Sequence, residues 1–255
     1  FVYGVDPFEI DVSKTNLGPS WDHPMGTDNI GRDVMARVLA GGRISLSVGF
    51  AAMIVGVFVC TAVGVLAGYF KRIDGLLMRI TDLFLALPIL PLLLVTIVLF
   101  REPLKESLGP NHGIFLLVVF VIGITSWMQV ARVVRGEVLA IKNKEFVLAA
   151  RSIGTRPRKI VMRHIVPNVL SPVMVSAALG VAAAILTESA LSFLGLGFPA
   201  DFPTWGRLLF DAKDYLQLAP MRVVWPGVMI SLTVMSVNFI GDGLRDALDP
   251  KLRSR

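Results

Sequence analysis

The side chains with the strongest chemical character gather in residues 137–167, between two apolar runs. From Arg132 to His164 the sequence carries nine Lys or Arg against two Glu. Gly154 and Pro157 interrupt the middle of this segment, which predicts two short helices joined by a turn. A basic element of this kind beside a membrane can bind anionic lipid headgroups, at about 1 kcal/mol per charge, or it can dock on a soluble protein.

No grouping typical of an active site is recognisable. His23, His112 and His164 lie in three different segments, so the sequence predicts neither a metal cluster nor a nucleophile–base pair. A Walker-type phosphate loop is also missing, so we do not expect this chain to hydrolyse ATP by itself. The single cysteine, Cys60, lies in an apolar run and cannot form an intrachain disulfide. We therefore expect no enzyme.

Composition indicates an all-α integral membrane protein. Hydrophobic residues make up 54% of the chain, charged residues 17%, and the mean hydropathy is +0.69; an ordinary soluble domain carries about 25% charged residues. The net charge of +6 lies mainly beside apolar runs, where the positive-inside rule places it, so we expect no nucleic-acid partner. Runs long enough to span a membrane are residues 44–70, 83–100, 113–131, 169–187 and 223–240.

Smaller features refine these spans. Residues 23–43 are predicted to form an interfacial helix that leads into the first span. Pro88 and Pro91 interrupt the second span. Ser176, Gly180, Ala184 and Glu188 share one face of the fourth. In the first span, small residues recur every four positions and predict a face for close helix packing: Ala52, Gly56, Cys60, Gly64 and Gly68.

The distribution of Lys and Arg predicts the orientation of the chain. Residues 71–82, 132–164 and the tail (242–255) carry a basic excess and are expected in the cytoplasm; residues 1–43, 101–112 and 188–222 carry none and are expected outside. The transmembrane domain would then be 44–241, with its N-terminus outside and no cleavable signal. One more span before Phe1 resolves this conflict, so we expect six spans in the intact protein and both ends in the cytoplasm.

The charged segment resembles a known motif. Leu148-Ala149-Ala150, three residues, Gly154, nine residues and His164-Ile165-Val166-Pro167 resemble the EAA loop of ATP-binding-cassette importer permeases, which reads Glu-Ala-Ala, three residues, Gly, nine residues, Ile-x-Leu-Pro. Two positions depart from the motif. Leu148 replaces the Glu, although Glu145 lies on nearly the same helical face, and His164 replaces the Ile.

Further stretches resemble the second (C-type) permease of dipeptide and oligopeptide importers, and together they cover nearly the whole chain from His23 to Leu252: residues 23–49, 68–88, 192–209 and 241–252. The resemblance implies a type I importer transmembrane domain with six spans in the bacterial inner membrane. It implies as partners a second homologous permease, two ATPase subunits or one fused ATPase, an extracytoplasmic substrate-binding protein, and membrane lipid. ATP and Mg²⁺ would bind to the ATPase subunits, with no cofactor on this chain.

The resemblance also implies roles for particular residues. A coupling helix at about residues 155–163 would dock on the ATPase, with Gly154 as its hinge. The residues expected to couple are Glu145, Leu148, Ala149, Ala150, Gly154, Thr155, Arg156, Pro157, Arg158, Lys159, Arg163, His164 and Pro167. Polar residues in or near spans could line the pathway or form interhelical hydrogen bonds: Ser126, Gln129, Glu188 and Asn238. The aromatic loop 188–222 could anchor at the membrane interface, dock the substrate-binding protein, or both.

Other functions remain open from the sequence. A permease of this type could import another cargo, such as a nickel chelate, haem or a glycan-linked peptide. A self-contained secondary transporter is a further alternative, although the predicted spans hold no ionisable residue in mid-membrane, which counts against proton coupling. A structural, lipid-anchored scaffold is the last alternative function. Purification with ATPase subunits and a second permease would distinguish these classes.

Overall fold

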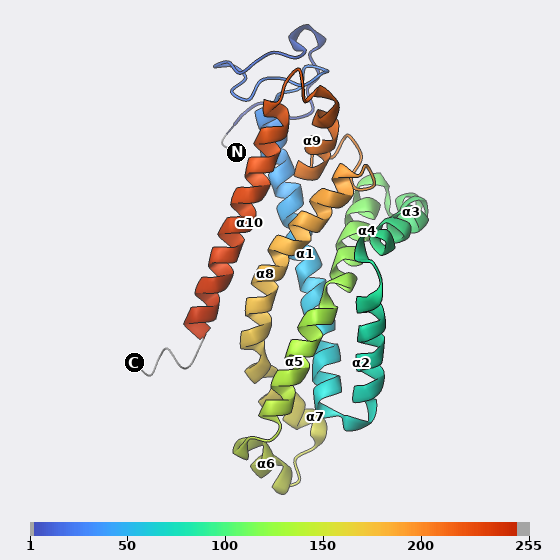
Figure 1. Cartoon of the computed structure of the whole chain (residues 1–255), viewed down its shortest axis with the longest axis vertical. Coiled ribbons are helices and arrows are strands. Elements are labelled where there is room, and N and C mark those ends of the chain that lie inside the picture. Colours follow the sequence, from blue (N-terminus) through green and yellow to red (C-terminus); the bar gives the residue numbers. More distant parts are fainter. Residues whose placement is uncertain (1–2, 249–255) are drawn as a thin grey trace. The chain divides into compact units, whose positions relative to one another are not determined.

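The structure is a computed structural model that describes residues 3–248. After an irregular N-terminal segment that holds one short 3-10 helix and an isolated β-bridge between Thr27 and Asp33, the described residues form helices joined by turns (Figure 1). They form two compact units. Unit 1 takes in the described residues through Phe50, with Leu94–Val119 and Ala182–Ser236; unit 2 takes in Ala51–Leu93, Phe120–Val181 and the described residues from Val237 on.

The two units divide the chain along the segments used to predict its orientation, and the orientation itself stays a prediction. Residues 1–43, 101–112 and 188–222, which we expect outside, all fall within the ranges of unit 1. Residues 71–82 and 132–164, which we expect in the cytoplasm, fall within unit 2, as does the described part of the tail. Segments assigned to one side of the membrane therefore pack with one another.

Three helical stretches are long and apolar enough to cross a membrane: α1 (Val34–Tyr69), the continuous helix Pro157–Phe193 and α10 (Met221–Leu248). Two bent pairs pass the same test, which gives up to five spans in the described residues. The five predicted spans correspond to the upper end of this range. The sixth span, expected before Phe1, stays a prediction.

The N-terminal helix α1 is longer than predicted. It starts at Val34, where Asp33 Oδ1 accepts a hydrogen bond of 2.7 Å from the backbone N–H of Ala36, and it runs without a break to Tyr69. The helical part of the segment predicted as an interfacial helix within 23–43 forms the first turns of α1 and runs into the first span without a break. Helix α1 has 36 residues, which at about 1.5 Å per residue makes it long enough to contribute to both units.

The second predicted span is broken rather than merely interrupted. Pro88 pushes Leu87 into an extended conformation (φ −77°, ψ 139°), so α2 (Lys71–Ala86) ends there and α3 (Ile89–Leu108) leaves at an angle of 89°. Pro91 lies in the first turn of α3, where a missing N–H costs nothing. The charged loop expected at 71–82 is wrong, because these residues lie inside α2.

The next connection is also more helical than predicted. Only Gly109, with φ +83°, separates α3 from α4 (Pro110–Thr125), so most of the loop expected at 101–112 is helix. The third predicted span bends by 43° at Ser126, after which α5 (Trp127–Ile141) continues.

The stripe of small residues is confirmed as a packing face in unit 2. A Cβ atom placed on Gly64 would lie 2.6 Å from Val134 Cβ, and one on Gly68 would lie 2.6 Å from Val138 Cβ. Cys60, which lies between Gly56 and Gly64 in the stripe, is fully buried. Only glycine allows α1 to approach α5 this closely.

The fourth predicted span begins earlier than residue 169. Helix α7 (Pro157–Ile160) continues through a π-helical turn, Val161–Ile165, into α8 (Val166–Phe193). The wider turn accommodates Pro167, whose ring would collide with the carbonyl of Arg163 in a regular α-helix. The loop expected at 188–222 holds the end of α8 and a short helix, α9 (Trp205–Ala212). The tail expected from 242 is helical through Leu248; residues 249–255 lie outside the described residues.

Candidate functional site

Helix α5, which leads into the charged segment, is held by polar contacts within unit 2. Arg135 binds Asp74 of α2 through both carboxylate oxygens, at 2.5 and 2.7 Å. Lys142 Nζ donates to the carbonyl of Gly68, at the end of α1, over 2.8 Å. Arg132 pairs with Asp82. Three of the nine basic residues counted in the sequence therefore fix α5 to its neighbours.

A glycine turn follows this braced helix. Helix α6 (Glu145–Ser152) ends at Gly154, which has φ +76°. The Thr155 N–H donates to the carbonyl of Ala150 (3.1 Å), and the Gly154 N–H donates to that of Arg151 (3.0 Å). These two bonds form a Schellman motif, which satisfies the last carbonyls of α6 and reverses the chain. Pro157 then occupies the first position of α7.

Buried apolar residues fix α6 and α7 onto the bundle. Val147 and Ala150 of α6 are 0% and 8% exposed, and they pack in one cluster with Ile160 and Ile165. The same cluster includes residues of α5 and α8. This apolar packing holds α6 in place, although Leu148 replaces the Glu of the motif. Of the two motif alanines, Ala150 belongs to this cluster, whereas Ala149 is exposed.

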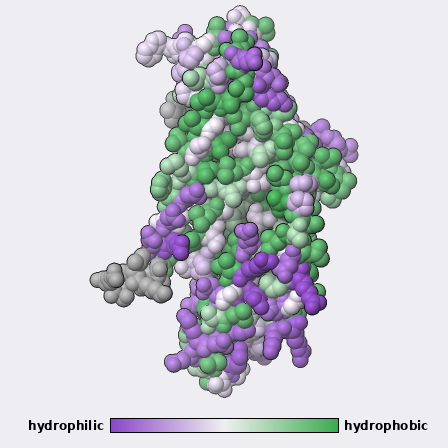
Figure 2. Space-filling view, viewed as in Figure 1, coloured by the Kyte–Doolittle hydropathy of each residue, from purple (hydrophilic) through white to green (hydrophobic). Residues whose placement is uncertain are grey.

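The opposite side of α6 and α7 is exposed, basic and partly apolar. In Figure 2, hydrophilic residues gather at the end of unit 2 where Figure 1 labels α6 and α7, with apolar patches among them. Ile153 is 82% exposed and Met162 63% exposed. Thr155 and His164 are half-buried; the ring of His164 lies 6.2 Å from that of Phe146. The remaining predicted coupling residues are exposed: Glu145, Leu148, Ala149, Gly154, Arg156, Pro157, Arg158, Lys159, Arg163 and Pro167. We call this set, with Phe146, Ile153 and Met162, the α6–α7 surface.

The four polar residues considered for the pathway have different local surroundings. Ser126 donates to the carbonyl of Ile122 over 2.6 Å, while Gln129 and Asn238 are exposed. Glu188 is fully buried and accepts two hydrogen bonds, as an interhelical contact would. Among the described residues, no group of three His, Cys, Asp or Glu could hold a metal ion.

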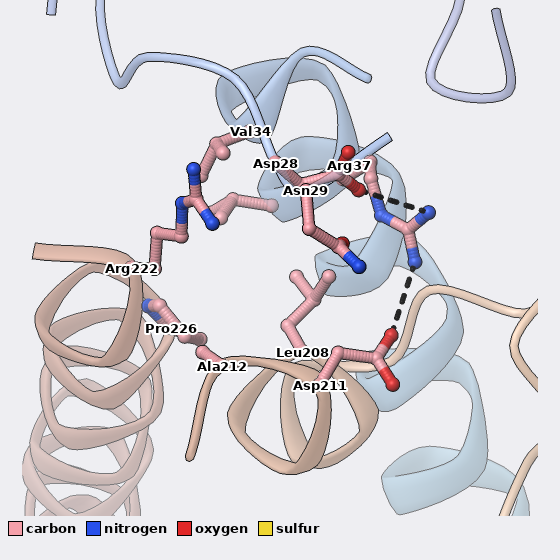
Figure 3. A pocket seen from close by; sticks show the side chains of 10 residues that line it. Asp28, Asn29, Val34, Arg37, Leu208, Asp211, Ala212, Arg222 and Pro226 are labelled. Atoms are coloured by element: carbon pink, nitrogen blue, oxygen red, sulfur yellow. Dashed lines mark ion pairs between the residues drawn. The ribbon is translucent and has the colours of Figure 1, made fainter. Parts of the chain in front are cut away.

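Unit 1 contains a pocket lined by residues of α1, α9, α10 and the N-terminal segment (Figure 3). Arg37, 2% exposed, lies at its wall between Asp28 (3.9 Å) and Asp211 (3.6 Å). Across the pocket, Arg222 donates to the carbonyl of Thr27 over 2.6 Å. These buried arginines join segments far apart in the sequence. Sequence reasoning missed them, and also missed the apolar residues of the α6–α7 surface.

Comparison with known proteins identifies the family. Residues 60–254 match the family described as "Binding-protein-dependent transport system inner membrane component". The chain is 42% identical over 247 residues to the dipeptide transport system permease protein DppC of Alkalihalophilus pseudofirmus, covering 96% of this chain and 78% of that relative. It is 39% identical to the oligopeptide transport system permease protein OppC of Bacillus subtilis, covering 95% and 78%. It is 38% identical to the glutathione transport system permease protein GsiD of Pectobacterium atrosepticum, covering 96% and 78%.

Solved structures agree on the fold. The chain superposes on the MetNI methionine ABC transporter, in inward-facing conformations, with a TM-score of 0.65, covering 85% of this chain and 98% of that chain. The sequence identity is 16%, so this similarity concerns the fold alone. With the apolar helices and the matched relatives, it follows that this chain belongs to the binding-protein-dependent transport system inner membrane components, as a multi-pass permease subunit of an ATP-binding-cassette importer.

Proposed function

We propose that this permease forms one half of the translocation pathway of a peptide importer and that its α6–α7 surface receives the force of a partner ATPase. The observation that carries the proposal is the division of this segment into two sides. Val147, Ala150 and Ile160 fix one side in the core, while the other side exposes Arg158, Lys159 and neighbouring apolar residues. A rigid element with a free basic face can transmit a push or pull to the helices that carry it.

The partners in this proposal are a second homologous permease, two ATPase subunits or one fused ATPase, an extracytoplasmic substrate-binding protein and membrane lipid. ATP and Mg²⁺ would bind to the ATPase subunits. The expected outer segments, residues 1–43 and 188–222, would receive the substrate-binding protein. They belong to one compact unit, so a single partner could contact both.

Peptides are the cargo that the relatives favour. The matched permeases are named for dipeptides, oligopeptides and glutathione, which share an amide backbone. A nickel chelate, haem or a glycan-linked peptide remains the alternative cargo. No side chain identified above singles out one of these ligands.

Co-purification followed by transport tests the proposal. Tagged full-length permease is expected to retain ATPase subunits and a second permease in mild detergent. In proteoliposomes, uptake of a labelled dipeptide should require ATP inside and the substrate-binding protein outside. Uptake by the permease alone without ATP would support a secondary transporter, and ATP-driven uptake of haem or a nickel chelate but not of dipeptide would change the cargo.

A further inference from the structure

Glu188 of α8 is a buried carboxylate whose hydrogen-bond partners carry no positive charge. Its side chain is fully buried in unit 1. Oε1 accepts a hydrogen bond of 2.7 Å from Ser192 Oγ, and Oε2 accepts one of 3.0 Å from Ser45 Oγ of α1. Among the described residues, no Lys, Arg or His binds it. A buried carboxylate is tolerated only where hydrogen bonds compensate for the lost water, so the source of these bonds matters.

The first source reaches Glu188 through Ser45. The backbone N–H of Trp205 donates to Ser45 Oγ over 3.2 Å. A hydroxyl has one proton to donate, and Ser45 directs it to Glu188. Both bonds therefore point toward the carboxylate.

The second source reaches Glu188 through two hydroxyls. The backbone N–H of Arg207 donates to Thr204 Oγ1 (3.1 Å), which donates to Ser192 Oγ (3.4 Å), which donates to Glu188. The guanidinium of Arg207 is not involved, because its Nε lies 2.9 Å from Asp211. This second path has the same direction as the first.

Both paths begin at N–H groups in the first turn of α9 (Trp205–Ala212), which have no partner inside the helix. The start of a helix also carries a partial positive charge, which an anion stabilises. The hydroxyls thus connect a buried anion to the positive end of a short helix. Glu188 gains hydrogen bonds through these hydroxyls, and the free N–H groups at the start of α9 gain acceptors.

Close packing leaves α9 little freedom around this connection. Trp205 is 2% exposed, and its Nε1–H donates to the carbonyl of Val38 over 3.0 Å. A Cβ atom on Gly206 would lie 2.5 Å from Ser189 Cα. Helix α9 can therefore pack on α1 and α8 in only one position, and a change at the Glu188 carboxylate must alter that position.

We propose that Glu188 is a positioning residue, whose carboxyl oxygens, each accepting one hydrogen bond, hold the start of α9 in place and thereby set the outer loop for the substrate-binding protein. The second clause rests on the proposed function. Glu188→Gln keeps the size of the side chain but introduces an amide donor. The new N–H group would face the hydroxyl proton of Ser45 or Ser192, two donors opposite each other. The hydrogen bond from that serine, and with it one of the two paths, is therefore lost.

The experiment measures the position of α9 and transport in the assembled importer. In a Cys60→Ala background, spin labels at Ser47 of α1 and at Asp214, after α9, report a distance by double electron–electron resonance; both positions are exposed. We expect Glu188→Gln to broaden this distribution. The concentration of dipeptide-loaded binding protein that half-stimulates the ATPase should rise about tenfold, while the maximal rate stays within about twofold.

Two variants make the result specific. Ser45→Ala removes one path and should shift both readouts in the same direction, and it replaces Glu188→Gln if that variant does not assemble. Ser189→Ala is the matched control, because this buried hydroxyl on the same helix has no hydrogen-bond partner, and it should change neither readout. An unchanged distance, an equal change in the control, or an unchanged half-stimulating concentration would overturn the proposal. If no binding protein stimulates the wild-type complex, the proposed function fails, while the distance still tests Glu188.

Discussion

Unit 1 buries several charged side chains and uses them within the chain, whereas unit 2 exposes a cluster of basic side chains around α6 and α7. Glu188 and Arg37 are 0% and 2% exposed, and each connects α1 to the segment around α9. On the α6–α7 surface, by contrast, Arg158 and Lys159 are exposed over a buried apolar cluster. A buried charge fixes the position of one element, while an exposed charge is available to a partner. The difference separates residues that shape this permease from residues that connect it to other subunits.

The largest effect is expected from Gly154→Val. Its φ of +76° is strained for a β-branched residue, although nothing lies within 4 Å of the missing Cβ. The turn should move, so binding-protein-stimulated ATPase activity of the reconstituted complex should fall to the basal rate while the subunits still assemble. Gly136→Val is the control, because Gly136 is helical and has the same open space. Full stimulation of the ATPase in Gly154→Val would show that the α6–α7 surface does not couple to the ATPase.

The second prediction concerns the buried side of unit 2. Gly64→Leu places a side chain where Val134 Cβ is 2.6 Å from the first added atom, so α1 must separate from α5. Overpacking of this kind costs about 1–3 kcal/mol, and the thermal midpoint of the purified permease should fall. Gly75→Leu, on α2 with open space, serves as the control. Equal midpoints would contradict the close contact between α1 and α5.

The third prediction tests whether exposed charge serves a partner. Arg158→Glu together with Lys159→Glu should leave the thermal midpoint unchanged, because both side chains are exposed. Affinity for the ATPase subunit should fall about tenfold at low salt and less at high salt. A binding assay with immobilised permease measures both. Loss of stability instead of affinity would place these residues with the internal charges of unit 1.

The fourth prediction concerns the ion pair that braces α5. Asp74→Asn removes one partner of the bidentate contact with Arg135, whose side chains are 20% and 33% exposed. Allowing for solvent screening, the loss should be about 1 kcal/mol of unfolding free energy. The exposed pair Glu102–Lys105 is the comparison, and Glu102→Gln should cost close to nothing. A double-mutant cycle with Arg135→Gln isolates the pair.

The smallest effect is expected at Tyr3, in the N-terminal segment. Burial, followed by the hydrogen bond to Asp33, raises the pKa of Tyr3 from 10.0 to about 12. The protonated hydroxyl therefore stabilises the fold below pH 10, and this contribution is lost as the pH rises from 10 to about 12. The difference in ultraviolet absorbance between wild type and Tyr3→Phe should show the late titration. A titration near pH 10 would mean that Tyr3 is not held against Asp33.

Several parts of the fold could be predicted because they depend on one stretch of chain. Apolar runs indicate spans, since the hydrocarbon layer sets the length a helix must cover. The small-residue stripe from Ala52 to Gly68 predicted a packing face, and α5 occupies it. Gly154 was predicted at a turn, and its positive φ confirms the turn; its role in coupling stays a prediction.

Other parts could not be predicted because they depend on position within an element or on distant partners. Pro88 and Pro91 are the same residue type, yet Pro88 ends a helix and Pro91 sits harmlessly in the first turn of the next. The charges at 71–82 suggested a loop, but Asp74 and Asp82 face α5 across a helix pair. Local composition does not distinguish a charge that faces water from one that faces a partner.

The sequence by itself determined the membrane class, the apolar stretches that form the candidate spans and the motif whose turn lies at Gly154, because hydrophobic length and backbone conformation are local properties. The tertiary structure alone decided which charges are internal. Glu188 accepts a hydrogen bond from Ser45, 143 positions earlier in the chain, and Ser45 in turn accepts one from the backbone N–H of Trp205 at the start of α9. Burial of a charge depends on what packs around it, and that is known only when distant segments have come together.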